Sequence, residues 1–118
     1  MRIACVIVHY HTPELACRAV VSVREDAAAS GLVVDVVVVD NGSDEEGLRR
    51  LDRIHARILR PEHNLGYAGG LNLGVAQTAA DYVVLMNADV EVIPGCLARL
   101  VETLRAGSPA TPHSTRHC

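Results

Sequence analysis

Apolar residues in this chain form two kinds of pattern, which alternate along most of its length. Short continuous runs, rich in Val and Ile, occupy residues 3–8, 33–39, 57–59 and 82–86. Longer segments with apolar residues at helical spacing occupy residues 15–29, 44–55, 67–78 and 97–104. The continuous runs are typical of strands buried on both faces of a parallel sheet, and the helical spacing is typical of helices that cover such a sheet.

The order of these segments predicts the fold class. Strand and helix alternate with short connections, which predicts an α/β fold with a mostly parallel sheet and right-handed crossovers. If the first three strands run outward and the fourth returns beside the first, the loops after the strands meet where such sheets bind their ligands. These loops are residues 9–14, 40–43 and 87–89.

The predicted helix starts differ in their chemistry. Thr12 with Pro13 provides an N-cap and a first-turn proline for the first helix, and Ser43 with Glu46 has the spacing of a capping box. The third helix contains glycines at 69, 70 and 74, each of which costs about 1 kcal/mol relative to Ala. Close packing of this helix on the sheet is one explanation, and close approach of a sugar diphosphate to its backbone is the other.

Composition narrows the classes of function. The 118 residues suffice for one domain, predicted over 1–106, and the absence of any hydrophobic pattern over 107–118 predicts a disordered tail. A formal net charge of -3 without basic clusters argues against nucleic acid as a partner. We expect no membrane span and no signal peptide, and therefore a cytoplasmic protein, either free or peripheral to the inner face of the membrane.

Two acidic residues directly follow predicted strands. Asp40 could accept hydrogen bonds from a base or ribose, although Asp-Asn-Gly-Ser is equally typical of a turn into a capped helix. Asp89 could hold a hard cation against phosphate oxygens. His9 and His11 lie two residues apart, and an ordinary loop role is favoured for them over a metal site. Neither the glycine fingerprint of nicotinamide-binding domains nor a Walker motif is present.

Four linked motifs make the combination specific. They are Val-Ile-Val-His-Tyr-His-Thr-Pro-Glu-Leu at 6–15, Val-Val-Asp-Asn-Gly-Ser at 38–43, Asn-x-Gly-Tyr-Ala-Gly-Gly-x-Asn-x-Gly at 64–74 and Leu-Met-Asn-Ala-Asp-Val at 85–90. Together they resemble glycosyltransferase family 2, and most of all its rhamnosyltransferase-like members. The resemblance covers residues 2 to about 105.

The resemblance implies a partial GT-A fold and an inverting transfer from a nucleotide-diphospho-sugar, UDP- or dTDP-linked, in a role such as polysaccharide biosynthesis. It implies that Asp40 faces a uracil or thymine imide and that Asp89 holds Mg or Mn against the diphosphate. The donor site that it implies comprises Tyr10, Thr12, Glu14, Asp40, Asn41, Ser43, Asn64, Gly66, Tyr67, Gly69, Asn72, Asn87 and Asp89.

The chain departs from the family in one respect. Family members continue into an acceptor half that carries the catalytic base, whereas no carboxylate follows Glu102 here. We therefore expect a donor-binding half with little or no turnover alone, whose acceptor could be a glycan, a lipid or a protein. The alternative is a non-catalytic nucleotide-sugar-binding or assembly module that associates through an open sheet edge.

Overall fold

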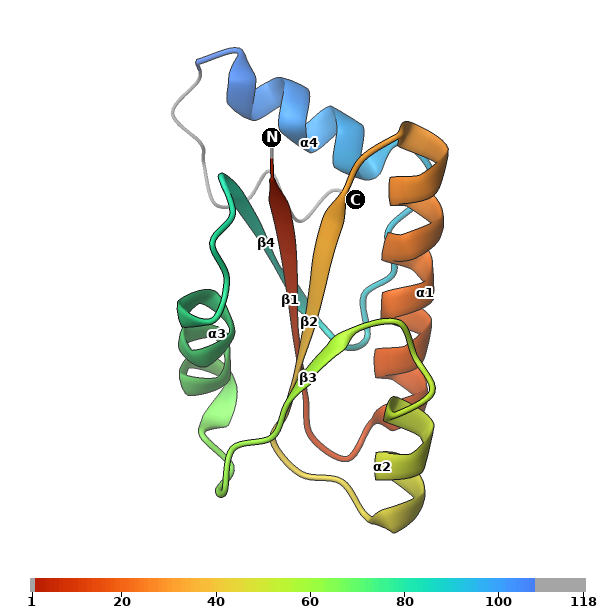
Figure 1. Ribbon diagram of the computed structural model, residues 1–118, viewed down its shortest axis with the longest axis vertical. Helices are drawn as coiled ribbons and strands as arrows, with labels where there is room; N and C mark the ends of the chain where they lie inside the picture. The colour runs from red at the N-terminus through yellow and green to blue at the C-terminus, as the bar shows by residue number, and fades with distance from the viewer. Residues whose placement is uncertain (1, 108–118) are drawn as a thin grey trace.

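Strands and helices alternate throughout the part of the chain that the computed structural model describes, residues 2–107 (Figure 1). In chain order they are β1 (Ile3–His9), α1 (Pro13–Ser30), β2 (Val34–Asp40), α2 (Glu45–Leu51), β3 (Arg57–Leu59), α3 (Gly66–Ala76), β4 (Tyr82–Asn87) and α4 (Cys96–Arg105). The predicted α/β class is confirmed. The predicted tail lies, from residue 108 onward, outside the described residues.

The sheet has the strand order β3-β2-β1-β4, and every neighbouring pair is parallel. This order confirms that the fourth strand returns beside the first. In the register, His9 lies opposite Asp40 and Val8 lies opposite Asn87. The loops that follow β1, β2 and β4 therefore begin at the same edge of the sheet, as the sequence predicts.

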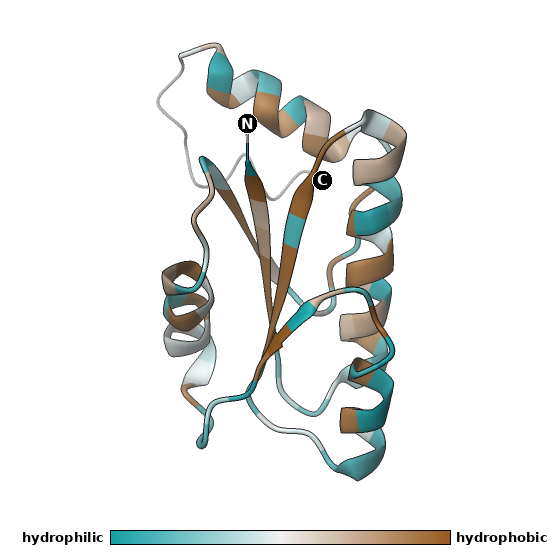
Figure 2. Ribbon diagram, in the orientation of Figure 1, coloured by the Kyte–Doolittle hydropathy of each residue, from teal (hydrophilic) through white to brown (hydrophobic). Residues whose placement is uncertain are grey.

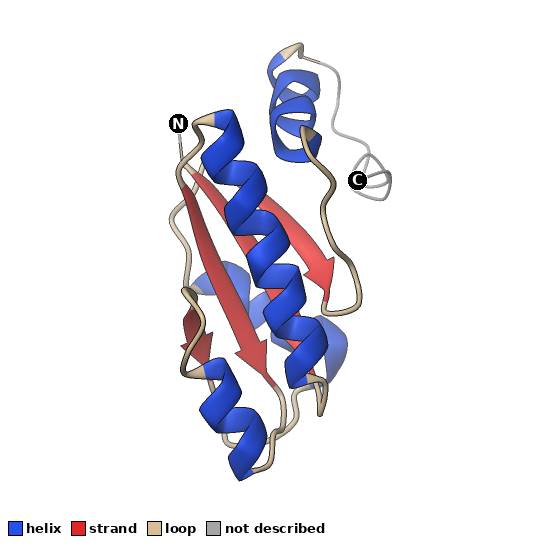
Figure 3. Ribbon diagram, turned by 90° about the vertical axis from the view of Figure 1, so that its right-hand side faces the viewer, coloured by secondary structure: helices blue, strands red, loops and turns tan. Residues whose placement is uncertain are grey.

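The helices cover the two faces of the sheet unequally. Helices α1, α2 and α4 lie on one side, and α3 lies alone on the other (Figures 1 and 3). Helix α1 buries small apolar residues against β1 and β2, and this contact forms the larger part of the core. The strands are almost entirely hydrophobic (Figure 2). These α1 residues are Ala16, Ala19, Val20, Val23 and Ala27.

Helix α3 approaches the sheet closely because two of its residues have no side chain. A Cβ at Gly74 would lie 2.3 Å from Cγ1 of Val6, and one at Gly70 would lie 2.9 Å from Cγ1 of Val8. Real Cβ atoms do not approach other atoms so closely, so at these positions the packing explanation of the glycines is correct. Gly66 differs, since its φ of +74° requires glycine for conformational reasons.

Helix α2 is shorter than predicted and is capped differently. It ends at Leu51 rather than near His55. The capping-box prediction is wrong, because Asp44 is the N-cap and its Oδ1 accepts the Gly47 N–H at 2.8 Å. The Ser43 hydroxyl is directed instead to the Asp40 carboxylate, to which it donates at 2.8 Å.

None of the helices within residues 2–107 combines the length and apolar character that crossing a bilayer requires.

Polar residues of the strands are confined to their ends. Asp35, the second residue of β2, is exposed and pairs with Arg57 at the start of β3 at 3.3 Å. Its position near the strand start agrees with the expectation from sequence, and it leaves the middle of the sheet apolar.

The close contact between α3 and β1 predicts that Gly74→Ala lowers the free energy of unfolding by about 1–3 kcal/mol, because the added methyl group must displace Val6 or the helix. Urea denaturation measures this change. Val75→Ala, at the neighbouring exposed position, is the control and should change stability by less than about 0.5 kcal/mol. Equal effects of the two substitutions would contradict the packing explanation.

Candidate functional site

A pocket of about 200 Å³ opens at the carboxyl edge of the sheet. It is lined by Val8, His9, Tyr10, Asn41, Asn64, Gly66 and Tyr67. Five of these seven are candidate donor-site residues from the sequence, and they come from three separate motifs. The rings of Tyr10 and Tyr67 are about half exposed, so both are accessible for stacking on a ligand.

A second pocket, of about 320 Å³, lies between the starts of α1 and α2. Thr12 and Glu14 of the predicted site line it, together with Arg50. Glu14 accepts from Arg50 at 2.6 Å, and Arg50 also contacts Glu46 at 3.1 Å. Thr12 is the N-cap residue of α1, but its side chain caps nothing and points toward His9 instead.

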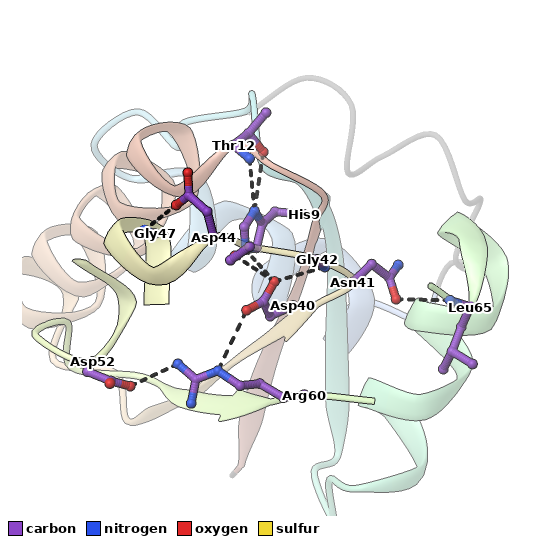
Figure 4. A network of polar contacts seen from close by, with 11 residues as sticks. His9, Thr12, Asp40, Asn41, Gly42, Asp44, Gly47, Asp52, Arg60 and Leu65 are labelled. Atoms are coloured by element: carbon purple, nitrogen blue, oxygen red, sulfur yellow. Dashed lines mark hydrogen bonds and ion pairs between the residues drawn. The ribbon is translucent and has the colours of Figure 1, made fainter. Parts of the chain in front are cut away.

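Asp40 ends β2 next to Asn41 of the pocket lining (Figure 4), and its side chain is only 2% exposed. Its Oδ1 accepts from the Gly42 N–H at 3.0 Å and from the Ser43 hydroxyl at 2.8 Å, and lies 3.1 Å from Nε2 of His9. The turn that the sequence allowed is therefore present. Among residues 2–107, the polar partner of the other oxygen, Oδ2, is Nε of Arg60 at 3.6 Å, so Oδ2 retains capacity to accept a hydrogen bond.

His9 was interpreted from the sequence as an ordinary loop residue, whereas the structure makes it the last residue of β1 and buries it. Its Nδ1 accepts the Thr12 N–H at 3.2 Å, so Nε2 carries the proton and donates it toward Asp40. Burial lowers the pKa of His9 below its ordinary value of 6.5 and outweighs the opposing effect of Asp40. The signal in the sequence is that His9 directly follows the apolar run 3–8, as Asp40 directly follows the run 33–39.

Asn41 connects the end of β2 to the start of α3. Its Oδ1 accepts the Leu65 N–H at 3.2 Å (Figure 4). Its Nδ2 donates to the Gly66 carbonyl at 3.0 Å. Asn64 accepts the Gly66 N–H at 2.8 Å. These side chains hold the backbone that borders the pocket, and Tyr67 follows on the first turn of the helix.

The remaining predicted residues lie outside the pocket lining. Gly69 and Asn72 lie further along α3, and Asn87 and Asp89 belong to the end of β4 and the loop after it. Asp89 is exposed and makes no hydrogen bond or ion pair within residues 2–107. The structure thus places Asp40 at the end of β2 and Asp89 two residues beyond the end of β4, and both strands flank β1 and end at the same edge of the sheet.

The loop after Asp89 is attached to α1 by side chains that the sequence did not reveal. Ser22 Oγ accepts the Val92 N–H at 3.0 Å. The two carboxylate oxygens of Asp26 accept the Gly95 N–H at 2.7 Å and the Leu97 N–H at 2.9 Å. A signal that could have indicated this attachment is the presence of a serine and an acid, Ser22 and Asp26, four residues apart on the apolar side of the helix.

The site can accommodate a divalent cation only in part. Across the described residues, no three His, Cys, Asp or Glu side chains gather as a metal-binding group. The free carboxylate of Asp89 is nevertheless a suitable oxygen ligand for Mg²⁺ or Mn²⁺, ions that in nucleotide sites take one or two carboxylates plus phosphates and water. The residues therefore fit a cation that arrives with a diphosphate.

A family described as "Glycosyl transferase family 2" matches residues 4–116 of this chain. The chain belongs to glycosyl transferase family 2. The match extends beyond residue 105, where the resemblance seen in the motifs ends. Among curated proteins, this family 2 chain is 26% identical over 89 residues to "Dolichol-phosphate mannosyltransferase" of Pyrococcus furiosus.

Solved structures show the same fold as this family 2 chain. A mannosyltransferase from Pyrobaculum calidifontis, in complex with GDP-Man and Mn²⁺, superposes with a TM-score of 0.74 at 22% identity over 91% of the chain. Glucosyl-3-phosphoglycerate synthase from Mycobacterium tuberculosis, in complex with Mn²⁺, UDP and phosphoglyceric acid, gives 0.63 at 24% identity over 86%. The predicted partial GT-A fold is confirmed.

The family 2 chain spans only part of these proteins. It covers 25% of the length of the Pyrococcus relative, and 32% and 38% of the two solved structures. The similarity is therefore to one part of each relative. The family match over residues 4–116 includes the sheet edge with both acidic residues, Asp40 and Asp89.

The attachment of the Asp89 loop predicts that Asp26→Ala lowers the free energy of unfolding by about 2–4 kcal/mol, because two backbone N–H groups lose a charged acceptor. Asp26→Asn should cost less, since one amide oxygen remains. Thermal and urea denaturation measure both variants. Glu25→Gln, at the exposed neighbouring position, is the control, and a loss as large as that of Asp26→Ala would disprove the specific attachment.

Proposed function

We propose that this chain is the donor-binding part of an inverting glycosyltransferase that uses a UDP- or dTDP-linked sugar. The observation that carries the proposal is the position of two carboxylates at one sheet edge: Asp40 is buried, and Asp89 is exposed and has no hydrogen bond or ion pair to residues 2–107. They serve different parts of one ligand. A nucleoside needs a fixed hydrogen-bond acceptor, and a diphosphate needs charge neutralisation.

Asp40 provides the acceptor for the base. Its Oδ1 is occupied by three donors, which fixes the carboxylate plane, and Oδ2 remains to accept the N3–H of uracil or thymine. Arg60 lies beside Oδ2 at 3.6 Å and must shift or contact the base when a ligand enters. Because the side chain is nearly inaccessible to water, this hydrogen bond would form in a medium of low dielectric constant.

The loops around the pocket provide the remaining contacts. Tyr10 and Tyr67 present exposed rings for stacking on the base or sugar. Asn64 and Gly66 border the same pocket, where the ribose and diphosphate would lie. The positive φ of Gly66 exposes backbone at the start of α3 without a Cβ that would obstruct a ligand.

Asp89 would hold Mg²⁺ or Mn²⁺. When bound, the cation would neutralise the charge that develops on the leaving diphosphate. The similar mannosyltransferase and glucosyl-3-phosphoglycerate synthase structures contain Mn²⁺ together with GDP-Man and UDP, respectively, which supports this role. The acceptor, whether glycan, lipid or protein, would enter from the side that the diphosphate leaves open.

Isothermal titration calorimetry tests the proposal. UDP and dTDP should bind in the presence of Mn²⁺, and Asp89→Ala should weaken that binding by at least about tenfold, because the cation loses its protein ligand. GDP serves as a comparison for the choice of base. Binding of UDP in the absence of metal should be weak in both proteins.

The control for Asp89→Ala is Asp81→Ala. Asp81 is an exposed carboxylate next to the same strand, but it lies at the opposite edge of the sheet, where it accepts the Arg2 N–H at 2.8 Å. Its removal should leave the affinity for UDP unchanged. Absence of nucleotide binding, or an equal loss in the two variants, would refute the proposed donor site.

A second candidate function, an assembly module, is favoured by the free edge of β4. Within the described residues, β4 pairs only with β1, and Leu85 in its middle is 42% exposed. Edge strands of this kind pair with other chains unless they are protected. Light scattering after size exclusion should then give a dimer that Leu85→Lys returns to a monomer, whereas a parent chain that is monomeric at all concentrations rules out this function.

A further inference from the structure

His9 is a buried polar residue to which the proposed function gives no role. Only 2% of it is exposed, yet it lines the pocket at the sheet edge together with Tyr10. It lies at the end of the central strand, between the loop that leads into α1 and the loop that leads into α2 (Figure 4). A buried imidazole is stable there only if both ring nitrogens are hydrogen-bonded.

The contacts of the ring define its proton distribution. The Thr12 N–H can only donate, so Nδ1, at 3.2 Å, must be the unprotonated acceptor. Nε2 then carries the proton and donates to Oδ1 of Asp40 at 3.1 Å, with the Ser43 hydroxyl 3.3 Å away. The neutral imidazole thus acts as a bridge with one acceptor and one donor, and reversing the tautomer would break both ends.

We propose that His9 is a positioning residue for donor recognition, which in its neutral form joins the loop before α1 to Asp40 and holds both in the arrangement that binds the nucleoside. This inference rests on the proposed function of the site. Without the Nε2 donor, Oδ1 of Asp40 keeps only the Gly42 and Ser43 contacts, which belong to its own turn. Without the Nδ1 acceptor, the Thr12 N–H loses its partner, and the loop that carries Tyr10 keeps the His11 N–H bond to the Gly42 carbonyl at 2.8 Å but loses its side-chain link to Asp40.

If Nδ1 were protonated, its N–H would face the Thr12 N–H, and neither donor would have an acceptor. The bridge would then be broken at the Thr12 end. Charged and polar groups face the ring from every neighbouring element: Asp40 at the end of β2, Ser43 in the loop after it, His11 and Thr12 in the loop before α1, and Arg60 behind Asp40. Burial and His11 lower the pKa of His9, and Asp40 raises it, with a net decrease.

The direction of the pH dependence follows from this decrease. The folded protein keeps His9 neutral at pH 7, and it binds the proton only below the ordinary value of 6.5. The unfolded chain binds that proton at the ordinary pKa, so protonation favours unfolding as the pH falls from above 6.5 toward the lower folded value. Nucleotide affinity should decrease over the range in which the folded form becomes protonated.

Two substitutions separate the ends of the bridge. His9→Asn keeps an oxygen near the position of Nδ1 and can accept the Thr12 N–H, but it is too short to reach Asp40. His9→Gln can donate to Asp40 but does not keep the acceptor in place for Thr12. Each should weaken binding of UDP with Mn²⁺ at pH 7.5 by about tenfold, the effect of losing one hydrogen bond of this kind. His55→Asn, at an exposed site after α2, is the control and should bind UDP as the parent does.

The pH profile distinguishes positioning from a merely structural role. The phosphate of UDP also titrates, but it does so equally in every variant, so the difference between parent and variant isolates His9. Between pH 7.5 and 5, the parent should lose more affinity than His9→Asn or His9→Gln. A parent that binds UDP, with variants of equal affinity and an equal pH profile, would overturn the role of His9 and leave the donor site intact. A parent that binds no nucleotide would overturn both.

Nitrogen NMR of the parent protein provides a measurement that needs neither nucleotide nor a folded variant. With ¹⁵N-labelled histidine at pH 7.5, His9 should show a protonated Nε2 and an unprotonated Nδ1, and it should titrate below 6.5. Its titration should shift the amide signal of Thr12. A proton on Nδ1 at pH 7.5, or an imidazolium at that pH, would overturn the inference.

Discussion

The parallel register of β1 with its two neighbours is the constraint on which the site depends. Seven residues of β1 pair with β2 and six pair with β4, so the end of the central strand is fixed from both sides. The register places His9 beside Asp40, both of them buried. Because an unpaired buried charge costs several kcal/mol, the strands can end at these residues only if the loops supply partners. The Gly42 N–H and the Ser43 hydroxyl are partners of Asp40, and the Thr12 N–H is the partner of His9.

The two faces of the sheet are covered by helices that pack in different ways, and the packing of α3 affects the position of the residues that border the pocket. Helix α1 uses Ala and Val side chains, whereas α3 approaches through Gly70 and Gly74, whose missing Cβ atoms let Val8 and Val6 contact its backbone. A helix that rests directly on the strands has little freedom to move. Its first turn is held in addition by Asn41, so the residues bordering the pocket are positioned by the sheet rather than by the loop alone.

The elements with a strong hydrophobic pattern could be predicted from the sequence, since the β-branched runs and the helical spacing each have one solution in a parallel sheet. Where a residue had two possible hydrogen-bond partners nearby, its partner could not be predicted from the sequence. Ser43 had both the spacing of a capping box and a neighbouring carboxylate, and burial of Asp40 decided for the carboxylate. His9 and Asp26 were missed for a related reason, because their partners are backbone N–H groups or carboxylates that only the tertiary fold brings close. The family resemblance nevertheless named five of the seven residues that line the pocket, because its motifs lie in the loops that follow the strands.

The two acidic residues at the sheet edge are held by unlike means, which suits the unlike tasks proposed for them. Asp40 is immobilised by three donors to one oxygen, so the direction in which its second oxygen accepts is defined before a ligand arrives. Preorganisation of this kind favours discrimination between bases, because a base that offers no donor leaves a buried acceptor unpaired. Asp89 interacts through charge, which depends weakly on angle and is tolerant of motion. Its loop is attached to α1 from Val92 onward, three residues later, so in the proposed donor site the carboxylate would follow a diphosphate while the sheet edge remains fixed.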